Sequence, residues 1–507
     1  MRIKTLISSG LTVAAILLYA LPASAQSFRV QCPAKTALHP NGSNVDAGHP
    51  GQVKCQHIAG GDGFATMGDG HQIYLFGFAP LSGLGDPANA AAKPGILTGK
   101  PGTQTPTVFN NQADVQGARI EPAAIMNNGV MYSNAPAPLM AIDEDDELFL
   151  TLSNVGQIMR PDLFEQHTVH FHGYPNASSF FDGVPDASVA INIAGSFTYY
   201  YTAPDAGTYF WHCHIAPPEH LQMGMVGQIY VRPRQNRVAD NASLYTALLN
   251  ANNANRSKVA DTNSATAGSC SDILCTGATP LPAGVTVGTN DAVQPVGGAT
   301  YAYNDGDGTT RYDYDVPIQM MGFDPNFHFV GMTFNPEAFA DMKDKYFLLN
   351  GRSYPDTIQT SFDNSATIGI DGATPVPNGP MTTEGSDGYS RPSQPLHSLV
   401  TLDKTNGKTR ALLRISDLSV TEHSTLATVG IPMQVIAENA RLLRDADGNN
   451  LYYKTNSVTL GGGESIDVIL DATDVPKGTY YLYSTNLDHL SNDAENFGGM
   501  MTEVVVK

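Results

Sequence analysis

The sequence predicts an all-β protein of two large Greek-key β-sandwich or barrel domains joined by a long linker. Three observations lead to this fold class. The 507 residues are 42% hydrophobic, few are charged, and Gly (49) and Pro (33) are abundant, as in β-rich globular proteins. Short strand-like stretches are bounded repeatedly by Gly, Pro, Asn or Asp. One such stretch also recurs in the second half of the chain.

In the first half, strand-like stretches follow one another at the spacing of a β-sandwich. They comprise residues 71–78, 148–152, 167–171, 189–193, 196–202, 207–214 and 228–231. We assign residues 26–232 to a first domain, which includes a Gly/Pro/Ala-rich loop at 80–118. Residues 233–312, rich in Asn, Ala, Thr, Gly and Asp, are predicted to form the linker, with one short helix around 243–250.

The strand pattern returns in residues 313–507, the predicted second domain. Residues 463–481 repeat the pattern of residues 195–210, including a Gly-Thr-Tyr segment that opens the last strand, which indicates a duplicated domain. When the two segments are aligned without gaps, the His-Cys-His triplet at 212–214 corresponds to Tyr-Ser-Thr at 483–485. The second domain is therefore expected to carry the scaffold without the metal ligands.

The N-terminal residues have the pattern of a secretory signal peptide. Met-Arg-Ile-Lys precedes an apolar run at 6–21 and Ala-Ser-Ala at 23–25, so residues 1–25 are expected to be removed on export. The run is too short to span a bilayer, and no other stretch approaches ~20 apolar residues. Because no twin-arginine pair is present, we expect a bacterial-type Sec signal, and hence a periplasmic or extracellular protein that is loaded with metal after export.

Five cysteines in an exported chain should pair, which leaves one over. Sequence proximity favours one disulfide between Cys32 and Cys55 and another between Cys270 and Cys275. Free or differently paired thiols are the alternative. Cys213 is then the remaining thiol, and it lies between two histidines.

The chain is acidic, with a formal net charge of −20. This argues against binding nucleic acid or an anionic membrane surface through bulk electrostatics, and it is compatible with attracting cations. An acidic run at 143–147 would suit a metal-ion substrate, but it directly precedes the strand at 148–152. We interpret it as a solvated turn.

Two histidine-rich stretches carry the chemistry of the chain: His-Thr-Val-His-Phe-His, which begins at His167, and His-Cys-His, which is centred on Cys213. Because side chains alternate along a strand, His167 and Cys213 point away from the other histidines of these stretches. His220 and Met225 follow downstream and would join them. Two imidazoles, a thiolate and a weak thioether form the ligand set of a blue-copper electron-transfer site.

The opposite faces of the same two stretches carry an all-imidazole cluster. Its members are His170, His172, His212 and His214. Such a cluster suits copper in a tetragonal or dinuclear arrangement. Zinc is the main rival metal, but a structural zinc site closes with four ligands and does not call for a second cluster behind it. One short peptide would thus serve two copper sites.

The remaining histidines are expected to be ordinary polar or core residues. They are His39, His49, His57, His71, His328, His397, His423 and His489. Met223 is a weaker axial candidate than Met225, and we expect it to pack. The pairs at 320–321 and 500–501 could be imagined as a Cu⁺ route, but a packing role is favoured for these methionines too.

The two motifs resemble those of the multicopper oxidases, whose copper-binding cupredoxin domain carries His-x-x-His-x-His-Gly and, later, His-Cys-His, His and Met. The similarity spans about residues 126–233 and includes Asp-Gly-Val-Pro at 182–185 and Gly-Thr-Tyr-Phe-Trp at 207–211. The resemblance implies two cupredoxin-like domains. It also implies oxidation of a reductant at one copper, electron transfer through Cys213, and reduction of O₂ at clustered coppers.

Carried over by position, the resemblance implies ligands for three kinds of copper. The type 1 copper would take His167, Cys213, His220 and Met225. The type 2 copper would take His170, and the type 3 pair would take His172, His212 and His214. The catalytic path between the sites would run through His212, Cys213 and His214.

Two departures from the family pattern bear on function. The gap between His214 and His220 is longer than usual and, with its two prolines, is closer to that of copper nitrite reductases. Those enzymes, however, have Asp where this chain has His170. The second domain lacks the two His-x-His pairs that a trinuclear cluster needs. At the matching positions it has Ser424, Ala427 and Val429, with His423 one residue off.

Three hypotheses follow. The first is a multicopper oxidase-like copper oxidoreductase that completes its second site at a subunit interface, as in a homotrimer. His328, His397, His423 or His489 of a neighbour would then supply a missing ligand. The second is a blue-copper electron carrier or copper-binding protein without O₂ reduction. The third, a nitrite-reductase-like enzyme, is disfavoured by His170.

The sequence leaves the electron donor open. A phenol, a metal ion such as Mn²⁺, Fe²⁺ or Cu⁺, or a redox protein would each serve, with O₂ as the expected acceptor.

Overall fold

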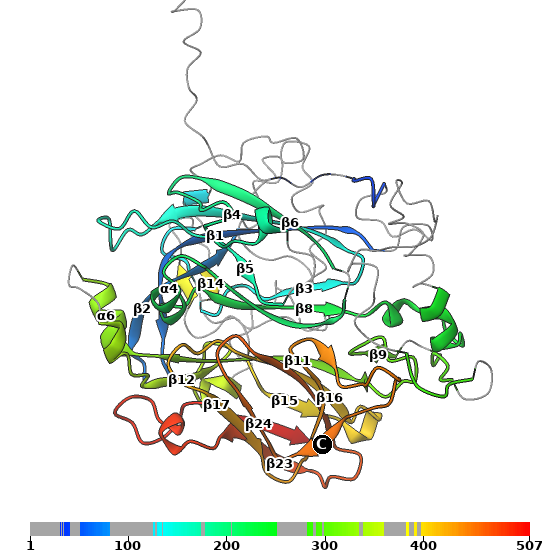
Figure 1. The fold of residues 1–507 in the computed structure, drawn as a ribbon. Helices are drawn as coiled ribbons and strands as arrows, with labels where there is room; N and C mark the ends of the chain where they lie inside the picture. The colour runs from blue at the N-terminus through cyan, green and yellow to red at the C-terminus, as the bar shows by residue number, and fades with distance from the viewer. Residues whose placement is uncertain are drawn as a thin grey trace, which may run out of the picture.

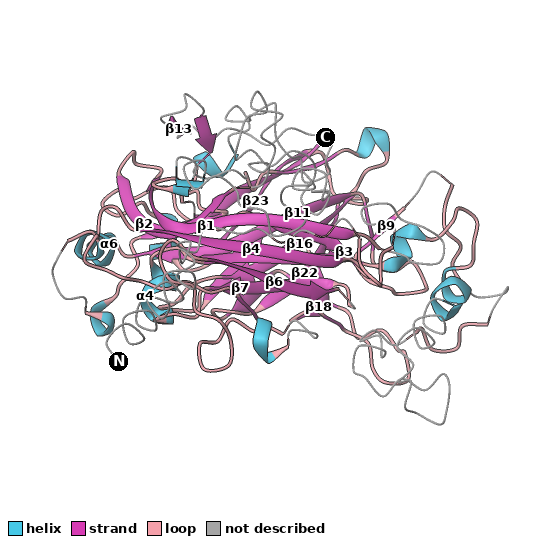
Figure 2. Cartoon of the chain, turned by 90° about the horizontal axis from the view of Figure 1, so that it is seen from above, coloured by secondary structure: helices cyan, strands magenta, loops and turns pink. Residues whose placement is uncertain are grey.

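A computed structural model of the chain shows two β domains stacked on each other (Figure 1). It describes residues 51–81, most of 125–250, most of 281–358 and 397–507, with a few short segments elsewhere. Strands dominate the described chain, and the helices are short and lie mainly around its periphery (Figure 2). None of the described helices is long and apolar enough to cross a membrane. The predicted all-β fold is confirmed.

The first domain is a sandwich of two four-stranded sheets. One has the order β2 (Gln72–Pro80), β1 (Val53–Thr66), β4 (Glu147–Gly156), β6 (Ser196–Thr202). The other has the order β3 (Met140–Asp143), β8 (Val226–Arg232), β7 (Gly207–His212), β5 (His170–Phe171). Alternate residues of each strand turn inward, so side chains such as Phe78, Leu150 and Trp211 form one buried core between the sheets.

The second domain is also a pair of packed sheets. The first has the order β12 (Tyr346–Leu349), β11 (Tyr314–Phe323), β16 (Arg410–Asp417), β22 (Ser465–Asp471), β18 (Met433–Glu438), β19 (Arg441–Leu442), with β20 (Tyr453–Thr455) also beside β18. The second has the order β15 (Val400–Leu402), β24 (Met501–Val506), β23 (Gly478–Ser484), β17 (Ser424–Thr428), β21 (Ser457–Leu460).

The two domains share one topology. The order β2-β1-β4-β6 corresponds to β12-β11-β16-β22, and β3-β8-β7-β5 corresponds to β15-β24-β23-β17. Strand directions agree as well, because β1–β4 and β11–β16 are parallel pairs, and so are β3–β8 and β15–β24. The shared topology supports the duplication that the sequence predicts.

The described part of the predicted linker folds back on the domains. Residues 244–250 are helical, as predicted, and β9 (Thr300–Tyr301) pairs with β10 (Arg311–Tyr312). The remaining short elements are α4 (Pro217–Gln222), α6 (Pro325–Gly331), β13 (Thr382–Glu384), β14 (Ser390–Pro392) and the 3₁₀ turns η3 (Ser179–Phe181), η4 (Arg234–Arg237), η6 (Phe339–Asp341), η7 (Asp356–Ile358), η8 (Lys404–Asn406) and η9 (Leu487–Leu490).

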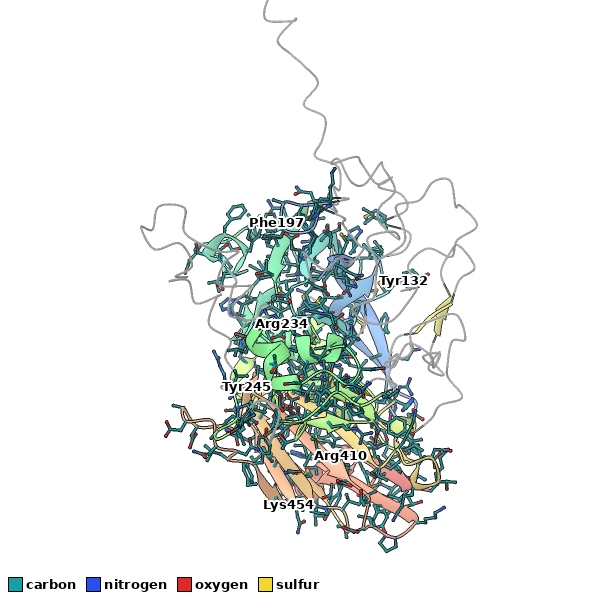
Figure 3. All side chains as sticks on the ribbon, turned by 90° about the vertical axis from the view of Figure 1, so that its right-hand side faces the viewer. Tyr132, Phe197, Arg234, Tyr245, Arg410 and Lys454 are labelled. Carbon is teal, nitrogen blue, oxygen red and sulfur yellow. The ribbon has the colours of Figure 1, made fainter. Side chains whose placement is uncertain are left out.

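A buried polar network joins β7 of the first domain to the second domain. The Thr208 hydroxyl donates to Asp467 Oδ1 at 2.6 Å. Arg414, which is fully buried, pairs with Asp315 at 2.7 Å, and its guanidinium lies 4.5 Å from the ring centre of Tyr230. Buried charges persist only when they are paired in this way. Figure 3 shows Phe197 in the first domain near one end of the described residues, and Arg410 and Lys454 in the second domain toward the other end.

The acidic run at 143–147 is not the solvated turn that we predicted. Glu144, Asp146 and Glu147 are nearly inaccessible to solvent. Basic residues at and just after the end of β8 neutralise the run: Arg232 pairs with Asp143 at 2.7 Å, and Arg234 and Arg237 pair with Asp145 at 2.9 and 2.7 Å. The prediction was wrong because the sequence cannot show that the C-terminal end of β8 lies beside this turn.

Among the described residues, Cys213 is a free and buried thiol. Cys32, Cys270 and Cys275 lie outside the described residues, so both predicted disulfides stay predictions. The predicted signal peptide also lies outside them. Met223 and the first members of the two methionine pairs are fully buried in apolar cores, which supports their predicted packing role.

Candidate metal centre

The first candidate site lies inside the core of the first domain, where β7 ends. His167, Cys213 and His220 are completely buried, and their ligand atoms all lie within 4.8 Å of one another. Cys213 Sγ is 3.3 Å from Nδ1 of His220 and accepts the Thr168 backbone N–H at 3.4 Å. Met225 is also fully buried in the same core cluster as Cys213. The structure therefore brings the predicted thiolate and two imidazoles together, and it buries Met225 in the same core cluster.

Local backbone geometry sets up this site. Ala216 adopts a left-handed conformation (φ 36°), and the two prolines that follow start α4, which carries His220 inward. Backbone hydrogen bonds then close the loop, because the Met225 N–H donates to His220 O at 2.8 Å and the Cys213 N–H donates to Met225 O at 3.0 Å. The prolines and these two hydrogen bonds together define the shape of the ligand loop.

Charge balance in the site favours a thiolate. Burial by itself raises the pKa of Cys213, but the imidazoles of His220 and His167 outweigh it and hold that pKa well below its usual range. Burial by itself lowers the pKa of His220, but the adjacent Cys213 thiolate raises it to about 10. A thiolate is the form of cysteine that binds metals.

A copper ion fits the donors of this site. Neither ring nitrogen of His167 has a nitrogen or oxygen partner, although both are buried. Buried polar atoms without partners are rare and call for an explanation such as a bound ion. Nε2 of His220 lies 3.6 Å from a carboxylate oxygen of Glu165, which leaves Nδ1 for the metal. Soft sulfur with imidazole nitrogen is the donor set that copper prefers.

The second candidate site lies behind the first, on the other side of the peptide at Cys213. Its core is His170, His172 and His212, whose ligand atoms lie within 4.8 Å of one another. Nε2 of His172 is 2.8 Å from Nε2 of His212, so these two nitrogens point at one spot. The ring centre of His214 lies 5.1 Å from that of His170, so His214 stands beside the trio.

Hydrogen bonds fix the orientation of the imidazoles in this site. His170 Nδ1 lies 2.7 Å from the carbonyl oxygen of Asp182, and His212 Nδ1 lies 2.7 Å from that of Cys213. A carbonyl can only accept, so each Nδ1 carries the proton and each Nε2 is free to bind metal. Burial and the neighbouring rings lower the pKa of His212 to about 3 and that of His172 to about 4. Both rings are therefore neutral, as metal ligands must be.

The second domain reaches this imidazole site through a glycine-rich turn. A Cβ added to Gly463 would come within 2.8 Å of His172 Nδ1, and the Gly463 backbone makes a hydrogen bond with that ring. Beside this contact lies a hollow of about 350 Å³ between the domains, which we call the interdomain hollow. Its walls are His172, Phe210, Pro217, Pro218, Leu221, Ser419, Val420, Thr421, Glu422, His423, Gly462 and Gly463.

The histidines predicted as ligands from a neighbouring subunit differ in accessibility. His328 and His489 are buried, and the ring nitrogens of His328 face the carbonyl oxygens of Tyr74 and Gln222. His397 is largely buried, whereas His423 is exposed and lines the interdomain hollow together with His172. Geometry therefore leaves His423 as the accessible member of this group.

Sequence reasoning missed three residues of the sites: Glu165 beside His220, Asp182 beside His170, and Gly463 beside His172. Glu165 gave a signal, because it stands two residues before His167 and strand alternation puts both on one face. Asp182 gave one too, because it opens the Asp-Gly-Val-Pro segment that resembles the family. Gly463 reaches the site through a turn that the sequence cannot place.

Two family models, both described as multicopper oxidase, match residues 114–236 and 344–503. Together they span more than half of the chain and both of its domains. The chain belongs to the multicopper oxidase family. The resemblance inferred from the two histidine motifs is thereby confirmed, and copper is the metal that this family of oxidoreductases binds.

Individual relatives match only part of this chain. Multicopper oxidase MmcO of Mycobacterium tuberculosis is 32% identical over 101 residues, which is 20% of this chain and 18% of that protein. Multicopper oxidase MCE of Talaromyces pinophilus is 30% identical over 143 residues, 28% of this chain and 22% of that protein. The chain thus spans less than a quarter of the length of these curated relatives.

Two further comparisons are with a curated nitrite reductase and with a solved structure. The copper-containing nitrite reductase of Rhizobium meliloti is 33% identical over 127 residues, 24% of this chain and 29% of that protein. Among solved structures, the blue copper oxidase from Nitrosomonas europaea has a TM-score of 0.49 and 16% identity, covering 90% of this chain and 86% of that one.

Proposed function

We propose that this protein is a copper-dependent oxidase that takes single electrons from a reductant at the buried Cys213 site and passes them to the imidazole site. One observation carries the proposal: a single three-residue segment, 212–214, supplies ligand-type side chains to two clusters that lie back to back. Packing alone would not place a buried thiolate in one cluster and two neutral, converging imidazoles in the cluster directly behind it. O₂ is the proposed acceptor.

Bound copper would supply the one-electron chemistry in both sites. The chain itself supplies the connection, because Cys213 is bonded covalently to both His212 and His214. Its carbonyl oxygen also accepts a hydrogen bond from His212 Nδ1 at 2.7 Å, which gives a second link between the sites. The buried walls of Trp211 and Phe210 exclude water from this path.

Electrons would arrive at the Cys213 site through His220. His220 is fully buried, but its outer nitrogen lies beside Glu165, whose side chain is 25% exposed. No other described carboxylate is paired with this nitrogen. The reductant would therefore approach over Glu165. The proposed donor is a small molecule, a metal ion or a redox protein.

The imidazole site lacks the second set of histidines that a trinuclear copper cluster needs. The matching positions of the second domain hold Tyr483, Ser484 and Thr485. We propose that His423 of a neighbouring copy completes the site in a homo-oligomer such as a trimer, since it is the exposed member of the candidate histidines. His423→Ala should then lower copper content at the imidazole site and leave the Cys213 site loaded.

The nitrite-reductase alternative has one supporting observation besides the relative named above. His172 and His212 converge at 2.8 Å, as a two-imidazole copper site on one chain would require. His170 in place of an acid opposes it, since that ring has its own carbonyl partner and joins the cluster as a third imidazole. A blue-copper carrier without catalysis is the remaining alternative.

Copper content per chain and the EPR spectrum, followed by O₂ uptake with a phenol or a metal-ion reductant, test the proposal. More than one copper per chain and O₂ consumption are expected. A single copper per chain without O₂ uptake would favour the blue-copper carrier. Turnover of nitrite without O₂ uptake would favour the nitrite-reductase-like enzyme. Cys213→Ser must abolish the blue absorption; a variant that stays blue sinks the assignment of the site.

Export to the periplasm or the extracellular space, with removal of residues 1–25, is part of the proposal. It rests on the signal-peptide pattern and on the even number of cysteines that remain once Cys213 is set aside.

A further inference from the structure

The second domain contains a buried pocket built like the Cys213 site of the first. Ser484 ends β23 as Cys213 follows β7, and the two strands hold equivalent places in their sheets. The Cys213 N–H donates to Met225 O at 3.0 Å, and the Ser484 N–H donates to Met500 O at 2.9 Å. Ser484 therefore occupies the position that corresponds to Cys213. Met500, which is fully buried, occupies the position that corresponds to Met225.

An imidazole takes the corresponding place in both domains. His220 Nδ1 lies 3.3 Å from Cys213 Sγ, and His489 Nδ1 lies 3.1 Å from Ser484 Oγ. The outer nitrogen of each ring faces a carboxylate. For His220 it is Glu165 at 3.6 Å, and for His489 it is Glu422 at 3.2 Å.

Strand register identifies the residue of the second domain that corresponds to His167, the remaining ligand-type residue of the Cys213 site. His170 is opposite His212 in the β5–β7 pair, and Ala427 is opposite Tyr483 in the β17–β23 pair. Counting three residues back from each partner gives His167 in the first domain and Ser424 in the second. The two carboxylates obey the same register, because Glu165 and Glu422 each precede these positions by two residues.

The two pockets differ in one aromatic contact. In the first domain Phe76 meets His220 edge-on, with ring centres 5.9 Å apart. In the second domain Phe347 stacks on His489 at 4.0 Å with an angle of 16° between the rings. Phe76 and Phe347 lie on the corresponding strands β2 and β12. The stacked Phe347 ring therefore covers one face of the His489 imidazole.

We infer that the pocket of Ser424, Ser484, His489 and Met500 is a blue-copper site disabled at two of its four ligand positions. It keeps the imidazole, the thioether, the outer carboxylate and the loop closure. It lacks the thiolate and the second imidazole, and two serine hydroxyls do not replace them as copper ligands. The inference rests on the proposed function because it takes the Cys213 site as a copper site.

The test is to restore the two missing ligands in the full-length chain. The substitutions Ser424→His and Ser484→Cys are made together in a Cys213→Ser background, so that the native site gives no blue signal. After loading with Cu²⁺, we expect a gain of one copper per chain, intense blue absorption and a narrow copper hyperfine splitting in the EPR spectrum. Adding His489→Leu to this variant should remove all three.

A matched control excludes adventitious binding by a new thiol. Ser457→Cys, on the exposed face of the neighbouring strand β21 in the same background, should produce no blue species. A folded double variant, shown by an unchanged far-UV CD spectrum, that takes up no copper or gives no blue absorption would overturn the inference.

A milder variant keeps the test decisive if the double variant does not fold. Ser484→Cys without Ser424→His, again in the Cys213→Ser background, changes one oxygen to sulfur beside His489. We expect a thiolate-to-copper charge-transfer band that disappears with His489→Leu; a band that survives this change contradicts the inference. The proposed function is decided separately, by whether the blue absorption of the unaltered chain depends on Cys213.

Discussion

The two sides of the peptide at Cys213 differ in how much of their surroundings the first domain supplies. On the sulfur side, every ligand-type residue is fully buried, and the loop from Cys213 to Met225 is closed by its own backbone hydrogen bonds. On the imidazole side, His170, His172 and His214 are partly exposed, and His172 contacts Gly463 of the second domain. The ligand-type residues of the sulfur side thus all come from one domain, whereas the imidazole side is also in contact with the second domain.

The largest expected effect separates the two sites. His172→Ala removes one of the two imidazole nitrogens that lie 2.8 Å apart. We expect loss of copper from the imidazole site and of nearly all O₂ uptake, while the blue absorption of the Cys213 site stays. Copper analysis and visible absorption of the same sample check this. Simultaneous loss of the blue colour would show that the sites are not independent.

A smaller effect is expected from the carboxylate beside His220. Glu165→Gln keeps the size of the side chain but removes the charge that faces Nε2. Because such outer partners orient and polarise a ligand, their loss costs roughly 10–100-fold in metal affinity. Competition with a copper chelator, followed by the blue absorption, measures the change. Glu422→Gln, the equivalent change in the second domain, is the control and should leave blue-copper affinity unaltered.

A third change tests the dependence of the imidazole site on the second domain. Gly463→Ala puts a methyl group 2.8 Å from His172 Nδ1 at a position with φ +90°. We expect an altered EPR signal from the imidazole-bound copper and lower O₂ uptake, with the blue absorption unchanged. Gly407→Ala, with φ +69° and no atom within 4 Å of the added Cβ, carries comparable backbone strain without the clash. Equal spectra for both variants would refute a specific role for Gly463.

The smallest effect concerns pH and the junction between the domains. Asp344 accepts hydrogen bonds from Gln222 of α4 and from Thr421, which lines the interdomain hollow. Burial raises its pKa from 3.8 to about 6. Between these pH values the folded chain binds more protons than the unfolded chain, so its stability falls as pH rises.

The size of this loss is of the order of 1–3 kcal/mol, given ~1.4 kcal/mol per pKa unit. Denaturant unfolding of the metal-free protein at about pH 4 and about pH 6.5 measures it, on either side of the shifted titration. Asp344→Asn, which cannot ionise, should reduce the difference between the two pH values. If Asp344→Asn leaves the difference in stability between the two pH values unchanged, Asp344 is not its source. The pH-dependent loss of stability would then come from other buried acids such as Asp417, whose pKa is also raised to about 6.

Much of the fold and of both sites could be predicted from local pattern. Strand alternation placed His167 and Cys213 on one face and the remaining histidines of both motifs on the other, and the structure has this arrangement. The duplication was also visible, because the Gly-Thr-Tyr segment begins both β7 and β23. Period-two alternation and local repeats are properties of neighbouring residues, which a sequence displays directly.

Contacts between distant segments could not be predicted in the same way. The acidic run was misjudged as solvated because Arg232, Arg234 and Arg237 reach it only after β8 has paired with β3. Nor did the sequence separate His423, beside the interdomain hollow, from buried His328 and His489.

By itself, the sequence determined which residues can serve as copper ligands and which strand face each occupies, because donor chemistry and alternation are local. Only the tertiary structure decided how those ligands are completed and covered. It brought Gly463 against His172 and set Glu165 beside His220. It also showed that Ser484, His489 and Met500 repeat the frame of the Cys213 site. These relations depend on packing between segments far apart in the chain, and no local pattern encodes them.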